Sequence, residues 1–117
     1  MIMYNLEDRT LVLAISVRDF LKQLPQNTAN SEDSKQLIRS SGSIGANYIE
    51  ANQSLSRKDF IMHMRISRKE AKESVFWLNI LLKSNHLNQE LNSQCIKLIS
   101  ETTEIKKILS AIINKSL

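Results

Sequence analysis

Residues 91–112, LNSQCIKLISETTEIKKILSAI, place apolar or small side chains at alternating spacings of four and three residues. The repeating positions are Leu91, Cys95, Leu98, Thr102, Ile105, Leu109 and Ile112. A mean period of about 3.5 residues is typical of a helix that packs lengthwise against other helices in a left-handed bundle. We therefore predict a long helix over residues 88–115, with Asn88 as its N-cap.

Three earlier segments carry the same kind of repeat and predict helices over residues 5–24, 32–54 and 57–84. The repeating positions of the first are Leu6, Thr10, Leu13, Val17, Phe20 and Leu24. Those of the second are Leu37, Ser41, Ile44, Tyr48, Ala51 and Leu55. Those of the third are Phe60, Met64, Ser67, Ala71, Ser74, Leu78 and Leu81. Together they predict one all-α domain over residues 1–117, an antiparallel up-down-up-down four-helix bundle.

Helix ends are marked by proline and by capping residues. Pro25 ends the first helix, because proline lacks an amide donor and clashes with the preceding turn. Ser31, which is followed by two carboxylates, is typical of an N-cap and predicts the start of the second helix. Ser56 and Asp59 resemble a capping box at the start of the third helix. Gly42, Gly45 and Ala46 predict close approach of a neighbouring helix.

Composition limits the class of protein. The chain has 117 residues with only two glycines and one proline, which favours long helices. It has no apolar run long enough to span a membrane and no leader-like N-terminus, so we expect a cytoplasmic protein with no membrane partner. Cys95 is the only cysteine, which excludes an internal disulfide. The net charge of +4 permits a polyanionic partner.

Several apolar side chains point away from the predicted core stripes, and they predict self-association. The predicted oligomer interface consists of Leu11, Val12, Ile15, Ile66, Phe76, Trp77 and Ile80. Ile38 and Ile49 lie beside the glycines of the second helix. The alternative is that some of these side chains widen the core of a single chain.

The sequence contains no decisive catalytic or metal-binding pattern, so we expect a non-enzymatic protein without a cofactor or metal. Two scattered histidines and one cysteine do not form a zinc site, and no Glu-x-x-His pair is present for a di-metal bundle. Arg57 and His63 match the Arg-x5-His spacing of the all-helical HEPN ribonucleases, in which His63 would transfer protons and Arg57 would stabilise the phosphate. That ribonuclease is a remote alternative, because residues six apart lie about 120° from one another on a helix.

Two polar surfaces are candidates for function. Arg39, Ser43, Asn47 and Glu50 lie along one side of the second helix, and Asn47 and Glu50 are expected to join Glu73 in a hydrogen-bonded network at a helix or subunit boundary. A basic ridge on the third helix is predicted to bind a phosphate backbone by charge. Its residues are Lys58, Arg65, Arg68, Lys69 and Lys72, with Arg57 at the edge. The alternative for both surfaces is a solvated helix face.

Three runs of sequence carry a family resemblance: LIRSSGSIGANYIE (37–50), DF (59–60) and RISRKEAKESVFWL (65–78). They resemble the 23S rRNA intervening-sequence protein family, also called the bacterial four helix bundle protein family. The family signature Arg-x3-Ser-x3-Asn-x2-Glu is matched by Arg39, Ser43, Asn47 and Glu50, and Asp59 and Glu73 match its acidic positions on the next helix. This chain departs from many members around Tyr48 and at Ala51, which replaces a glycine.

The resemblance implies a bacterial four-helix bundle that assembles as a homopentamer. It also implies similarity to the accessory variability proteins of diversity-generating retroelements, which bind nucleic acid and a reverse transcriptase through a basic surface. Expected partners are therefore further copies of the chain, RNA or another nucleic acid, and a reverse transcriptase or ribosome-associated protein. The alternative function is a structural or protein-interaction module that binds no nucleic acid.

Overall fold

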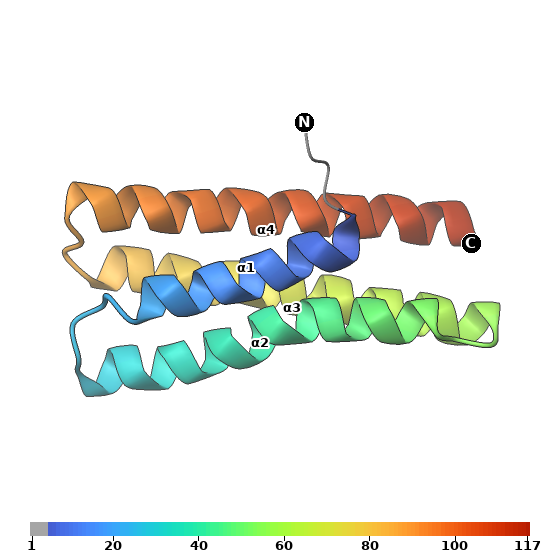
Figure 1. Ribbon diagram of the computed structural model, residues 1–117, viewed down its shortest axis with the longest axis horizontal. Coiled ribbons are helices and arrows are strands. Elements are labelled where there is room, and N and C mark those ends of the chain that lie inside the picture. Colours follow the sequence, from blue (N-terminus) through green and yellow to red (C-terminus); the bar gives the residue numbers. More distant parts are fainter. Residues whose placement is uncertain (1–4) are drawn as a thin grey trace.

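The computed structural model describes residues 5–117, which form four helices and no strand. The helices are α1 (Leu6–Leu21), α2 (Thr28–Asn52), α3 (Arg57–Ser84) and α4 (Gln89–Ser116). Consecutive helices lie side by side and are joined by short connections at alternating ends (Figure 1). The predicted all-α four-helix fold is confirmed. Within residues 5–117 no helix combines the length and the apolarity that crossing a membrane requires.

An asparagine or serine side chain caps the N-terminus of each helix. The caps are Asn5, Asn27, Ser56 and Asn88, and each accepts a hydrogen bond of 2.8–3.1 Å from the backbone N–H three residues later. The predicted start of α2 at Ser31 was wrong. Asn27 accepts the N–H of Asn30 instead, so α2 begins one turn earlier and contains Ser31. Helix α1 ends at Leu21 rather than at residue 24, and Leu24 is still buried.

The predicted core stripes are confirmed with few exceptions. All six repeating positions of α1 are buried, and Ile44, Leu78 and Ile105 are completely buried. The prediction was wrong at Leu55, which is fully exposed because α2 ends at Asn52 and leaves it in the turn before α3. At the end of α4, Ile113 is buried and Ile112 is only half-buried.

Helices α1 and α2 approach closely at Gly45. A Cβ atom on Gly45 would lie 2.6 Å from Oγ1 and 3.0 Å from Cβ of Thr10, closer than atoms can pack. Gly42 differs, because a Cβ there would meet only Nη2 of Arg18 at 3.8 Å. The packing role predicted for the small residues of α2 therefore belongs to Gly45, and Ala46 is exposed.

Helix α1 is much shorter than the other three. It contacts α2 and α4 but not α3, so within the described chain α1 and α3 occupy opposite corners of the bundle. Figure 1 shows that α1 covers only part of the bundle length, and that α2, α3 and α4 continue beyond its first turn. The outward faces of α1 and α3 consequently point to different sides of the molecule.

Candidate nucleic-acid interface on helix α3

The outward face of α3 carries a row of exposed basic side chains. Lys58, Arg65, Lys69 and Lys72 are all exposed, whereas the positions between them that face the core, such as Met64 and Ala71, are buried. Among the residues that the structure describes, none of these four cations takes part in a salt bridge. We use the term basic ridge for these four residues. At a rise of about 1.5 Å per residue, the ridge is roughly 20 Å long.

Arg68, which was predicted as part of the ridge, is placed differently. It is half-buried, and its Nη1 lies 3.5 Å from Oγ of Ser110 on α4. Arg57 also reaches α4, where its Nε donates a 2.5 Å hydrogen bond to the carbonyl of Ser116. Both guanidinium groups are therefore tied to α4 and less available to an external phosphate.

The two carboxylates in the middle of α3 face α2 and bind Arg39. Nη1 of Arg39 lies 3.2 Å from Glu70, and Nη2 lies 2.5 Å from Glu73. Burial raises the pKa of Glu70, whose side chain is only 8% exposed, although the charge of Arg39 opposes this rise. The hydrogen bond from Arg39 lowers the pKa of Glu73. One arginine thus binds both carboxylates from α2, and Glu73, four residues after Lys69, lies at the border of the basic ridge.

The predicted network of Asn47, Glu50 and Glu73 does not form within one chain. The side-chain amide of Asn47 donates to the carbonyl of Ser43 on its own helix at 2.9 Å. Ser43 in turn donates to the carbonyl of Arg39 at 2.8 Å. Helices α2 and α3 run in opposite directions (Figure 1). The salt bridge places Glu73 opposite Arg39, and the bond from Ser67 to Ile44 places the segment of α2 with Asn47 and Glu50 beside an earlier part of α3. Arg39 is the member of the signature that links the two helices.

Other polar contacts between α2 and α3 were not predicted from the sequence. Ser40 and Ser74 share a buried 2.8 Å hydrogen bond, and Ser67 donates to the carbonyl of Ile44 at 2.7 Å. Ser67 and Ser74 occupy core positions of the predicted repeat of α3, and these serines could have indicated close, hydrogen-bonded packing against α2.

An apolar groove of about 820 Å³ lies along the N-terminal half of α3. Ile61, Met62, Ile66 and the exposed Leu117 provide its apolar surface. Its rim is formed by Arg57, Lys58, Asp59, Arg65 and Lys69. Part of the basic ridge therefore borders apolar surface rather than other polar groups.

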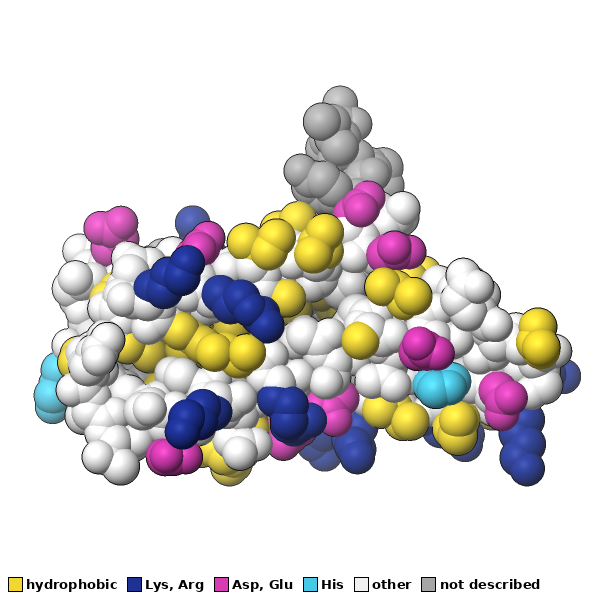
Figure 2. All heavy atoms as spheres, turned by 60° about the horizontal axis from the view of Figure 1, so that its bottom comes forward, with side chains coloured by type: hydrophobic (Ala, Val, Ile, Leu, Met, Phe, Trp, Pro, Cys, Tyr) yellow, Lys and Arg dark blue, Asp and Glu magenta, His cyan; other side chains and the backbone are white. Residues whose placement is uncertain are grey.

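The apolar side chains predicted to mediate self-association fall into two groups. Leu11, Val12 and Ile15 of α1 are 59%, 45% and 50% exposed, and Figure 2 shows hydrophobic side chains protruding over α1 beside acidic ones. On α3, Phe76 is 57% exposed, whereas Ile66, Trp77 and Ile80 are half-buried.

Trp77 fits the alternative prediction, in which some of these apolar side chains widen the core of a single chain. It packs against the core and meets Phe76 edge to face, with 5.1 Å between ring centroids. Its indole N–H lies near Glu73 and contributes to lowering the pKa of that carboxyl group, but it does not reach hydrogen-bond geometry.

Arg57 and His63 do not converge on a common site. Arg57 is bonded to the end of α4, and His63 is half-buried at a helical position about 120° away. Within residues 5–117, no three His, Cys, Asp or Glu side chains cluster in a way that could hold a metal ion. Cys95 is buried in the core, and burial raises the pKa of its thiol to about 11.

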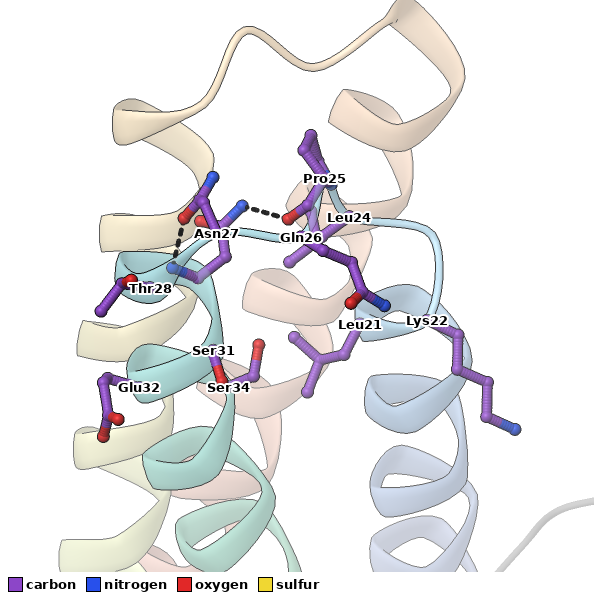
Figure 3. A pocket seen from close by; sticks show the side chains of 11 residues that line it. Leu21, Lys22, Leu24, Pro25, Gln26, Asn27, Thr28, Ser31, Glu32 and Ser34 are labelled. Carbon is purple, nitrogen blue, oxygen red and sulfur yellow. Dashed lines mark hydrogen bonds between the residues drawn. The ribbon is translucent and has the colours of Figure 1, made fainter.

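A polar hollow of about 600 Å³ lies beside the connection between α1 and α2. Figure 3 shows Leu21 and Ser34 pointing into the space between the two helices, below the connection that contains Pro25. Asn30 holds this connection in place, because its side-chain amide donates to the carbonyl of Pro25 and exchanges hydrogen bonds of 2.9 Å with Asn85. Neither asparagine belongs to a repeat, so no sequence pattern indicated this pair.

Comparison with known proteins identifies the family. The family model of the 23S rRNA-intervening sequence proteins matches residues 5–111, almost the whole chain. The chain belongs to this family. A crystal structure of a protein of unknown function from the S23 ribosomal protein family of Bacteroides thetaiotaomicron has 34% sequence identity and a TM-score of 0.79. The match covers 93% of this chain and 98% of that chain. No curated protein matches the chain.

The residues predicted as a family signature, Arg39, Ser43, Asn47 and Glu50, can be followed along α2. Arg39 joins α2 to Glu70 and Glu73 of α3, and Ser43 and Asn47 continue along α2 by hydrogen bonds within the helix. Glu50 is exposed, and within the described chain its carboxylate forms no salt bridge. The signature therefore stabilises the α2–α3 pair at Arg39.

Proposed function

We propose that this 23S rRNA-intervening sequence protein is a non-enzymatic module that binds RNA or another nucleic acid by charge, through the basic ridge of α3. In this proposal it is built as an antiparallel up-down-up-down bundle and works as a ring of five copies, the number that the family resemblance implies. Its place of action is the cytoplasm. A ribosome-associated protein or a reverse transcriptase is a proposed protein partner.

The observation that carries this proposal is the separation of charge around α3. Glu70 and Glu73 are held by Arg39 on the side facing α2, while Lys58, Arg65, Lys69 and Lys72 are exposed on the outward face. A phosphate approaching the outward face therefore meets four cations and, within the ridge itself, no carboxylate. Each cation that neutralises a phosphate releases a condensed counterion, which gives affinity without reading the base sequence.

Salt-titrated binding to a structured RNA tests the proposal. We expect the triple variant Lys58→Glu, Arg65→Glu and Lys69→Glu to lose about one to two orders of magnitude in affinity. The slope of log K against log salt concentration should become less negative by roughly two to three. The three side chains are exposed, so the fold should be unchanged. Lys72 is left intact, because it lies one helical turn before the exposed Phe76.

A matched control is the triple variant Lys35→Glu, Lys97→Glu and Lys115→Glu. It also replaces three exposed lysines outside the basic ridge, and both variants change the net charge from +4 to −2. We expect a much smaller loss in the control, because the basic ridge is intact. Lys35→Glu also removes the exposed pair with Glu32, which contributes little to stability. Equal losses in both variants, or no binding by the unmodified protein at low salt, would contradict the proposal.

A protein-interaction module without nucleic-acid binding is the second candidate, and the groove beside the basic ridge favours it. Ile61, Met62 and Ile66 line this groove. Apolar side chains do not bind a phosphate backbone, but they can pack against the apolar side chains of a protein partner. This candidate predicts no binding of RNA at low salt, so the same titration separates the two functions.

A further inference from the structure

Helix α1 presents a short apolar stripe with an acidic residue at each of its two ends. Asp8, Val12, Ile15 and Asp19 follow one another at spacings of four, three and four residues, so they lie on one line along the helix. All four are exposed, and they lie opposite the buried positions Thr10, Leu13 and Val17. Figure 2 shows this side of the molecule, with hydrophobic side chains protruding over α1.

Helix α3 presents the complementary pattern. Lys72, Phe76, Ile80 and Lys83 follow at spacings of four, four and three residues, with a basic residue at each end. Both lysines and Phe76 are exposed, and Ile80 is half-buried. Phe76, Ile80 and Lys83 line a shallow apolar groove of about 400 Å³ together with Asn79 and Ser84.

The two stripes match in length as well as in chemistry. The acidic ends of the first and the basic ends of the second are each eleven residues apart, which is about 16 Å on a helix. When the stripes face one another, each carboxylate meets a lysine and the apolar side chains are enclosed between the two ion pairs. We propose that the α1 stripe of one copy docks on the α3 stripe of the next copy, which refines the self-association proposed above and rests on it.

The charged ends are available for this contact. Within residues 5–117, Lys72, Lys83 and the carboxylate of Asp8 form no salt bridge. Asp19 has one partner, Lys22, at 4.0 Å, and both side chains are more than half exposed. Such a pair contributes little and is easily exchanged for another.

The position of the stripes makes the contact head-to-tail. Helices α1 and α3 occupy opposite corners of the bundle, so one copy uses its two stripes for two different neighbours. A head-to-tail contact of this kind generates a closed ring or a filament and not a symmetric dimer. Lys58, Arg65 and Lys69 lie beyond the docked stretch of α3 and remain uncovered, so the assembly leaves most of the basic ridge free.

Charge reversal tests the pairing by sedimentation velocity. We expect Asp8→Lys with Asp19→Lys, and separately Lys72→Glu with Lys83→Glu, to weaken assembly at least tenfold, because like charges then face one another at both ends. The variant that carries all four changes restores opposite charges and should recover the size of the unmodified assembly. Failure of this fourfold variant to recover assembly, or unchanged size in both twofold variants, would overturn the pairing.

Two blocking variants test the head-to-tail arrangement. Ile15→Asp blocks the α1 stripe, and Phe76→Asp blocks the α3 stripe, at side chains that are about half exposed and outside the core. Each variant alone should sediment as a 13.4 kDa monomer, and an equimolar mixture should form only a one-to-one complex through the remaining intact pair of stripes. A mixture that stays monomeric, or an unmodified protein that is monomeric or a simple dimer at 100 µM, would overturn the inference.

These outcomes are independent of the test of nucleic-acid binding. If the unmodified protein forms an oligomer but the charge reversals have no effect, the pairing of stripes is wrong and self-association stands. If the monomeric Ile15→Asp variant still binds RNA in a manner sensitive to Lys58, Arg65 and Lys69, the basic ridge functions without the assembly.

Discussion

At the scale of single residues, Arg39 determines how the charges of α3 are distributed. Its side chain is half exposed, whereas the side chain of its partner Glu70 is almost completely buried. A buried carboxylate without a counter-charge is strongly unfavourable, so the charge of Arg39 stabilises Glu70 in its buried position. The same arginine pairs with Glu73, so the carboxylate that borders the basic ridge already has a counter-charge from α2.

We predict that Arg39→Met lowers the free energy of unfolding by roughly 1–3 kcal/mol at pH 7, less than for a fully buried pair because Arg39 is half exposed. The loss should shrink as the pH falls from 7 to 5. Glu70 has a raised pKa in the folded chain, so the folded variant takes up a proton before the unfolded chain does and gains stability in this range. Urea unfolding at several pH values measures the trend.

The variant that combines Arg39→Met with Glu70→Gln is the control for this prediction. It has no ionisable group at position 70, so its loss of stability relative to Glu70→Gln alone should be independent of pH between 5 and 7. Glu73 loses its hydrogen bond from Arg39 in Arg39→Met and in this control alike, so a pH dependence that belongs to Glu73 would appear in both comparisons. If the loss of unfolding free energy in Arg39→Met stays constant or increases as the pH falls, Glu70 is not the group that causes the pH dependence.

At the scale of helices, sequence patterns predicted the elements well and their ends less well. The heptad repeat of α4 identified its buried face, since helix periodicity is a direct consequence of burying one side. The start of α2 was misplaced because Ser31 and Asn27 are both good caps, and only the path of the connection from Pro25 decides between them. The link from Arg39 to Glu70 was not predicted, because it depends on how far α2 and α3 are shifted along each other.

The contact between α1 and α2 allows a paired prediction. Gly45→Ala adds a Cβ 2.6 Å from Oγ1 of Thr10, so we expect a loss of about 1–3 kcal/mol in unfolding free energy despite the better helix propensity of alanine. Gly42→Ala is the matched control, because its Cβ meets nothing closer than 3.8 Å. There the higher propensity of alanine should dominate and stabilise the protein by up to about 1 kcal/mol. Thermal or urea unfolding measures both, and similar effects in the two variants would contradict close packing at Gly45.

At the scale of the whole molecule, α3 carries two outward-facing surfaces at different positions along its length. The N-terminal part of α3 carries Lys58, Arg65 and Lys69, and its C-terminal part carries Phe76 and Ile80. Helical periodicity predicted that both groups face outward. Periodicity within one chain could not predict that α1, with its acidic and apolar stripe, lies at the opposite corner, because that depends on which helices contact one another.

This arrangement predicts that assembly raises the affinity for long nucleic acids but not for short ones. One basic ridge is about 20 Å long and spans about six base pairs, so a longer duplex can contact ridges of several copies and gains from a high effective concentration. We expect the Ile15→Asp variant to bind a duplex of about 40 base pairs at least tenfold more weakly than the unmodified protein, with a smaller salt dependence. A duplex of about eight base pairs should bind both proteins equally, because it reaches one ridge only. Fluorescence anisotropy measures both, and equal affinity of the two proteins for the long duplex would show that each copy binds on its own.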